Sequence, residues 1–127
     1  MKVSKNILVS LVMAASMAVV SSAAFAAPQG EAAVKEAIEN TISGITAAQT
    51  AIKGGDLSSA SQDILKAAQA SKEFRFEVTE RQRQKATDVL KTARKSIEAG
   101  DIPAGEAGLE TALKSFTEMK AKYDLTH

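Results

Sequence analysis

Apolar residues recur every three or four positions in four separate stretches of the chain. In the first stretch, from Val34 to Ile52, the intervals are 4, 3, 4, 3 and 4 residues. This spacing places side chains on one face of an α-helix. The same spacing is found in three later stretches, at 57–74, 86–97 and 109–123. The pattern predicts an all-α, up-down-up-down four-helix bundle with these four faces in its core.

Two short segments with a shared pattern divide the stretches into pairs. AIKGGDL and SIEAGDI each contain an Ile, two further residues, Gly-Asp and an aliphatic residue. Gly55 and Gly100 are placed where a helix ends in left-handed backbone, a conformation that Gly adopts without a steric cost. Asp56 and Asp101 can then cap the first amides of the next helix. Each segment is predicted to be the tight turn of a helical hairpin.

The two hairpins have matching registers, which indicates an internal duplication. A shift of 45 residues aligns apolar positions before and after the turns, including Ile45 with Leu90 and Ile64 with Leu109. Leu57 and Ile102 are expected to pack back across their turns. In the last stretch, we expect Leu113 and Phe116 to be buried.

The connection between the hairpins allows two interpretations. Neither Gly nor Pro occurs between Asp56 and Ala99, so one unbroken helix of about 40 residues is possible. Against it, apolar residues alternate with polar ones in FRFEV, which interrupts the helical spacing. Thr79 and Gln82 then have the spacing of a capping box, which would start a new helix. We therefore predict a break at 75–79.

The first 26 residues have the pattern of a secretory signal peptide. Two lysines precede an apolar run from Ile7 to Val20, and the small-residue sequence Ala-Phe-Ala ends at Ala26. An uncleaved N-terminal anchor is the alternative. Cleavage after Ala26 would leave 27–127 as one domain in the periplasm or outside the cell, without a transmembrane span.

Few residues of this domain are suited to catalysis. The chain has no Cys, and its single His is His127, the last residue, which is expected to be frayed. It contains no G-x-S-x-G, phosphate-binding loop or H-E-x-x-H motif. Without Lys2 and Lys5, 14 basic and 15 acidic side chains remain, so the excess of positive charge typical of nucleic-acid binding is lacking. We expect a protein that is not an enzyme, has no cofactor and binds no nucleic acid.

Five glutamates are candidate ligands of a hard cation such as a divalent metal. Glu73, Glu77 and Glu80 would share one face if a helix continued through the connection, and Glu106 and Glu110 are four residues apart. Carboxylates bind such cations. The alternative is that they pair with Lys and Arg on solvated helix faces.

The strongest charge asymmetry lies in 75–95, where basic residues exceed acidic ones by four. Such an excess suits an anionic partner, either a protein or a component of the cell envelope. The alternative is a solvated surface with intrahelical ion pairs. The candidate partner-binding residues are Arg75, Arg81, Arg83, Lys85, Lys91, Arg94 and Lys95.

The C-terminal sequence AGDIPAGEAGLETALKSFTEMKAKYDL, together with the leader and four helices, resembles small periplasmic four-helix-bundle proteins. One group is the b-type haem bundle cytochromes, which hold haem between a Met of the first helix and a His of the last. Here the first mature helix has no Met and Lys120 stands in place of the His, so haem is not implied. A second group is the small periplasmic metal-binding proteins built from duplicated hairpins, which are rich in His.

The segment VTERQ at 78–82 is similar to the LTxxQ motif of the periplasmic Spy/CpxP stress chaperones. This resemblance implies a role in the envelope stress response. We therefore expect a non-enzymatic periplasmic binding or stress-associated protein that acts through protein or envelope contacts. The alternative is a carrier of a small ligand, either a divalent metal or a haem-like cofactor.

Overall fold

A computed structural model describes residues 30–127, and the expected signal peptide lies outside this range. The described part consists of four α-helices and one short 3₁₀ helix, with no strand among these residues. None of these helices is both long enough and apolar enough to cross a membrane. The prediction of an all-α four-helix bundle is confirmed. The elements are α2 (Glu31–Lys53), α3 (Leu57–Ser71), η1 (Glu77–Thr79), α4 (Glu80–Glu98) and α5 (Ile102–Thr126).

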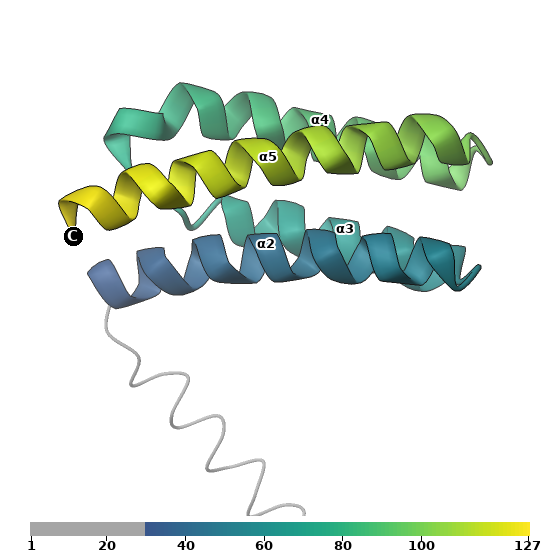
Figure 1. Ribbon diagram of the computed structural model, residues 1–127, viewed down its shortest axis with the longest axis horizontal. Helices are drawn as coiled ribbons and strands as arrows, with labels where there is room; N and C mark the ends of the chain where they lie inside the picture. The colour runs from purple at the N-terminus through teal and green to yellow at the C-terminus, as the bar shows by residue number, and fades with distance from the viewer. Residues whose placement is uncertain (1–29) are drawn as a thin grey trace, which may run out of the picture.

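The helices are arranged as two antiparallel hairpins, α2 with α3 and α4 with α5 (Figure 1). Both tight turns lie at one end of the bundle. The α3–α4 connection lies at the other end, together with the start of α2 and the end of α5. Because α3 also packs against α4 and α2 against α5, each helix has two neighbours and the topology is up-down-up-down.

The core is built from the predicted apolar faces. Burying a side chain of the size of Val, Leu or Ile contributes about 1.5–3 kcal/mol to the free energy of unfolding. Leu113 differs from the prediction because it is only partly buried, at the edge of the core. Its neighbour Ala112 lies on the buried face of α5, and successive helical residues are about 100° apart. The largest fully buried side chains include Ile38, Ile45, Ile64, Phe74, Leu90, Leu109, Phe116 and Met119.

The two hairpin turns have the predicted geometry. Gly55 and Gly100 have φ values of 79° and 88°. The N–H of each Gly donates to the carbonyl three residues earlier, at 3.0 and 3.1 Å, and the N–H of the next residue donates five residues back, at 2.9 and 2.8 Å. These bonds form a Schellman motif in both turns. Asp56 and Asp101 then cap the following helices by accepting from the amides of Ser59 and Ala104, at 3.1 and 3.3 Å.

The connection between the hairpins is broken, as the alternating pattern indicated. Helix α3 ends at Ser71 and α4 begins at Glu80. The predicted capping box is wrong, because Thr79 makes no side-chain bond to an amide of α4. Thr79 belongs to η1, and its hydroxyl instead bonds to the Phe76 carbonyl of that turn at 3.3 Å. Gln82 is directed to α5, where its side chain bonds to Glu118 at 3.4 Å.

Aromatic side chains close the end of the bundle at this connection. Phe74 is buried there, with the Phe76 and Tyr123 rings edge-on to it at 6.2 and 5.9 Å. His127 is exposed but does not extend freely into solvent as expected. Its ring stacks on Tyr123, with centroids 3.9 Å apart and planes inclined by 12°. The Tyr123 hydroxyl donates to the Glu31 carbonyl at 3.2 Å, which joins the end of α5 to the start of α2.

Candidate functional site

A groove runs between α3 and α4 and is open to solvent. It consists of two adjoining hollows of about 350 and 540 Å³, which share Arg94 and Glu98. We call it the α3/α4 groove. Its α3 side is lined by Leu57, Ser58, Ser61, Gln62, Ile64, Leu65, Ala68, Gln69 and, directly after the helix, Lys72. Its α4 side is lined by Lys91, Arg94, Lys95, Ile97 and Glu98, and Gly100 lies beyond the end of that helix.

The floor of the groove is apolar because α3 carries leucines beside its core face. Leu65 directly follows the fully buried Ile64, so it lies about 100° around the helix from the core face. Leu57 is seven residues before Ile64 and therefore lies in line with the core face, but it is the first residue of α3, next to the turn. Both leucines are 37% exposed, and they are two of the four large apolar residues that are exposed within 30–127. Leu57 therefore differs from Ile102, its counterpart after the second turn. Ile102 packs against the core.

Four cationic side chains surround this floor, with one carboxylate among them. Arg94 is held in place, because its Nε donates to Ser61 Oγ at 3.0 Å and its Nη2 lies 3.9 Å from a Glu98 oxygen. The lysines at 72, 91 and 95 differ from it. Within residues 30–127, no carboxylate oxygen lies within 4.0 Å of their ammonium groups. The groove therefore has a net charge of +3, and its lysines are available to an anion.

The four cations line the same hollow of the groove, and they come from both of its sides. Because α3 and α4 are antiparallel, contacts between them give their register: Thr87 lies opposite Ser71, and Arg94 lies opposite Ser61. Lys72 directly follows Ser71, and Lys95 is eight positions after Thr87, which corresponds to about 12 Å along α4 at 1.5 Å per residue. An anionic ligand that contacted all four cations would therefore occupy this one hollow.

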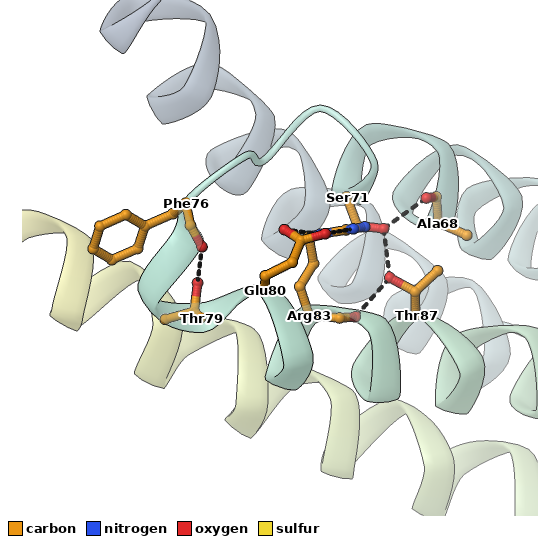
Figure 2. A network of polar contacts seen from close by, with 7 residues as sticks. All are labelled: Ala68, Ser71, Phe76, Thr79, Glu80, Arg83 and Thr87. Carbon is orange, nitrogen blue, oxygen red and sulfur yellow. Dashed lines mark hydrogen bonds and ion pairs between the residues drawn. The ribbon is translucent and has the colours of Figure 1, made fainter.

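A buried polar network fixes the two helices at the Lys72 end (Figure 2). Ser71 Oγ and Thr87 Oγ1 lie 2.8 Å apart, and each also lies near a local carbonyl, Ala68 O at 2.7 Å and Arg83 O at 2.9 Å. Two hydroxyl protons cannot serve three bonds at once. One hydroxyl therefore donates across the interface while the other donates locally, and every buried polar side-chain atom in the described residues has a partner.

The structure separates the seven basic residues predicted from the sequence. Lys91, Arg94 and Lys95 lie together in the groove. Arg83 does not, because its guanidinium pairs with Glu80 one turn earlier and its side chain is only 13% exposed. That hydrogen-bonded pair holds the pKa of the Glu80 carboxyl below its usual value. Of the other three, Arg81 and Lys85 are exposed on α4 outside the groove, and Arg75 lines a separate hollow with Glu73.

Lys72 and Leu65, two of the groove residues on the α3 side, were not among the candidates from the sequence. The signal was present, since Leu65 and Lys72 are seven residues apart and so lie within about 20° of each other on one side of α3. To recognise these residues as part of a groove, one must know that this side of α3 borders α4. Helical periodicity alone does not establish which helices are neighbours.

The acidic candidates do not come together as a metal site. The helix is interrupted between Ser71 and Glu80. Glu73, Glu77 and Glu80 therefore do not share one helical face, which their prediction as metal ligands required. Glu106 and Glu110 are exposed on α5. In the described range, no group of three or more Asp, Glu or His side chains is arranged to hold a metal ion.

Comparison of the chain with family models, with curated proteins and with solved structures gives no significant match in any of the three. The function is therefore inferred from the groove itself.

Proposed function

We propose that the protein is a non-enzymatic binding protein of the cell envelope, acting in the periplasm or outside the cell. In this proposal it holds an anionic partner, a protein or an envelope component, in the α3/α4 groove. The observation that carries the proposal is the combination of three lysines without carboxylate partners and an apolar floor. Clustered charge of one sign raises the local concentration of oppositely charged partners.

The chemistry of the groove supports binding rather than turnover. Its side chains are Lys, Arg, Gln, Ser and aliphatic groups with a single Glu. The Ser61 hydroxyl accepts a hydrogen bond from Arg94, whereas a nucleophilic Ser requires a general base as its partner. A Glu98 oxygen lies 3.9 Å from Arg94 Nη2, so Glu98 also acts as a partner of this guanidinium.

The test is retention of envelope components on the immobilised protein. The groove variant carries Lys72→Gln, Lys91→Gln and Lys95→Gln, since Gln keeps helix propensity and removes the charge. The control variant removes the same charge from exposed lysines outside the groove, through Lys35→Gln, Lys66→Gln and Lys114→Gln. The wild-type and control proteins should retain the same component, and the groove variant should not.

High salt should release that component, because raising the ionic strength from about 0.1 M to about 1 M shortens the screening length from about 10 Å to about 3 Å. Equal retention by the groove variant would contradict the proposal. Stoichiometric metal or a haem absorption band in the protein purified from the envelope would instead support a small-ligand carrier.

A further inference from the structure

We infer that the occupant of the α3/α4 groove is an acidic amphipathic helix of a partner protein. This inference rests on the proposed function and narrows it to one class of partner. Helix-in-groove recognition requires an elongated apolar trough, anchor positions at helical spacing and complementary charges at the edges. The groove is elongated, exposes one leucine in each of its two hollows and has cations on both edges, and the Arg94–Ser61 hydrogen bond crosses it between the leucines.

Its length suits a helix of several turns. Helix α3 has 15 residues, which corresponds to about 22 Å at 1.5 Å per residue, and the two hollows extend from Leu57 at its start to Lys72 just beyond its end. The exposed Leu57 and Leu65 are eight residues apart, or about 12 Å along the axis. A partner helix with apolar residues at positions i, i+4 and i+8 presents anchors over the same distance.

The charges indicate carboxylates on both flanks of that helix. Lys91 and Lys95 are four residues apart on α4, so they lie about 6 Å apart along the axis of one edge. Lys72 lies on the α3 side near the far end. A helix with Glu or Asp on either side of its apolar stripe would meet both edges, with its carboxylates separated by whole turns as these lysines are.

Other anionic occupants fit fewer of these observations. A single-chain amphiphile has one charged headgroup, whereas the hollow lined by the four cations has a net charge of +3. A linear polyanion without apolar groups would leave Leu57 and Leu65 in water. A second copy of this chain is the remaining possibility. These occupants therefore serve as the alternatives in the test.

The probe is a synthetic acidic peptide of about 18 residues, or five helical turns. It carries Leu at i, i+4, i+8 and i+12, Glu on both flanks, and Ala and Gln elsewhere. Binding to the purified protein is measured by fluorescence anisotropy. A peptide of the same composition in scrambled order tests whether the amphipathic arrangement matters. A peptide with Lys for Glu tests the sign of the charge.

We expect the acidic peptide to bind and both control peptides to bind much more weakly. Lys72→Gln, Lys91→Gln and Lys95→Gln together should weaken binding about tenfold or more, because each ion pair in such a partly exposed site contributes modestly. The same change at Lys35, Lys66 and Lys114 should leave the Kd nearly unchanged.

A second pair of variants tests the apolar contact that Leu65 is expected to make with the peptide. Leu65→Gln should weaken peptide binding about tenfold, as loss of a buried anchor does at helix-binding surfaces. Val78→Gln replaces a side chain that is 75% exposed and lies outside the groove, so it should have no effect. Circular dichroism of each variant confirms that the fold is retained before binding is compared.

Three outcomes would overturn the inference. The first is equal affinity for the scrambled peptide. The second is groove-dependent binding of dodecanoate, polyphosphate or phosphatidylglycerol vesicles without binding of the acidic peptide, which would leave the proposed function standing. The third is groove-dependent dimerisation of the protein alone in analytical ultracentrifugation, which would assign the groove to a second copy.

Discussion

Gly54 and Gly55 are adjacent residues with opposite backbone requirements. Gly54 has φ −81° and is still helical, whereas Gly55 has φ 79°. An L-residue in left-handed backbone costs about 1–2 kcal/mol. The same substitution at the two positions therefore separates the conformational role of Gly55 from helix propensity.

Gly55→Ala should lower the free energy of unfolding by about 1 kcal/mol or more. Gly54→Ala should raise it by about 0.4–1 kcal/mol, because Ala fits the helical backbone there and restricts the unfolded chain. An added Cβ at Gly54 would lie 3.6 Å from the nearest carbonyl oxygen, an ordinary contact. Urea denaturation of both variants measures the difference. Equal effects at the two positions would contradict the assigned turn geometry.

The α4–α5 hairpin depends on close approach between its helices. Gly105 is buried inside α5, and a Cβ at this position would overlap the side chain of Ile97. Gly108, one turn later, is similarly close to Ala93, at 2.9 Å from an added Cβ. These glycines do not mark helix ends, although Gly usually does. Helical packing requires a small residue at each position.

The sign of the change in unfolding free energy caused by Gly105→Ala tests whether α4 and α5 must approach this closely. Helix propensity alone predicts a gain of about 1 kcal/mol, whereas overpacking predicts a net loss of about 1–3 kcal/mol. We expect the loss in thermal or urea unfolding. Combined with Ile97→Ala, the penalty of Gly105→Ala should largely disappear, because the side chain it meets has been removed. A stabilised Gly105→Ala protein would show that the helices can separate without cost.

The helices and turns could be predicted from the sequence more completely than the contacts between helices. Four helices, two Gly-Asp turns and the break after α3 follow from periodicity and turn chemistry. Two interpretations of the sequence were wrong because the side chains concerned bond to neighbours in the same segment. Thr79 has the spacing of a capping box but bonds within η1, and Arg83 contributes to the basic excess but pairs with Glu80. The groove residues Lys72 and Leu65 become visible only when α3 lies beside α4.

For the whole molecule, two carboxyls with lowered pKa values make the stability depend on pH. Hydrogen bonds from Ser59 hold the pKa of Asp56 below its usual value, and the bond from Arg83 does the same for Glu80. A carboxyl with a lowered folded pKa stabilises the fold above its unfolded pKa. That contribution is lost as the pH falls through the folded pKa.

Stability should therefore decrease on acidification below about pH 4.5, near the ordinary pKa of these carboxyls. Unfolding of the Asp56→Asn, Glu80→Gln double variant should depend less steeply on pH in this range. Asn retains the capping ability of Asp, so the change isolates the titration. Identical slopes for the wild-type and variant proteins would show that other groups account for the acid sensitivity.

The proposed contact surface for the partner is the α3/α4 groove. Photocrosslinking in intact cells examines this surface, with a photoreactive amino acid placed at Leu65 in the groove or at Val78 outside it. We expect an adduct from position 65 that disappears when Lys91→Gln and Lys95→Gln are added, and no adduct from position 78. An adduct from position 78 with none from position 65 would show that the partner does not bind in the groove.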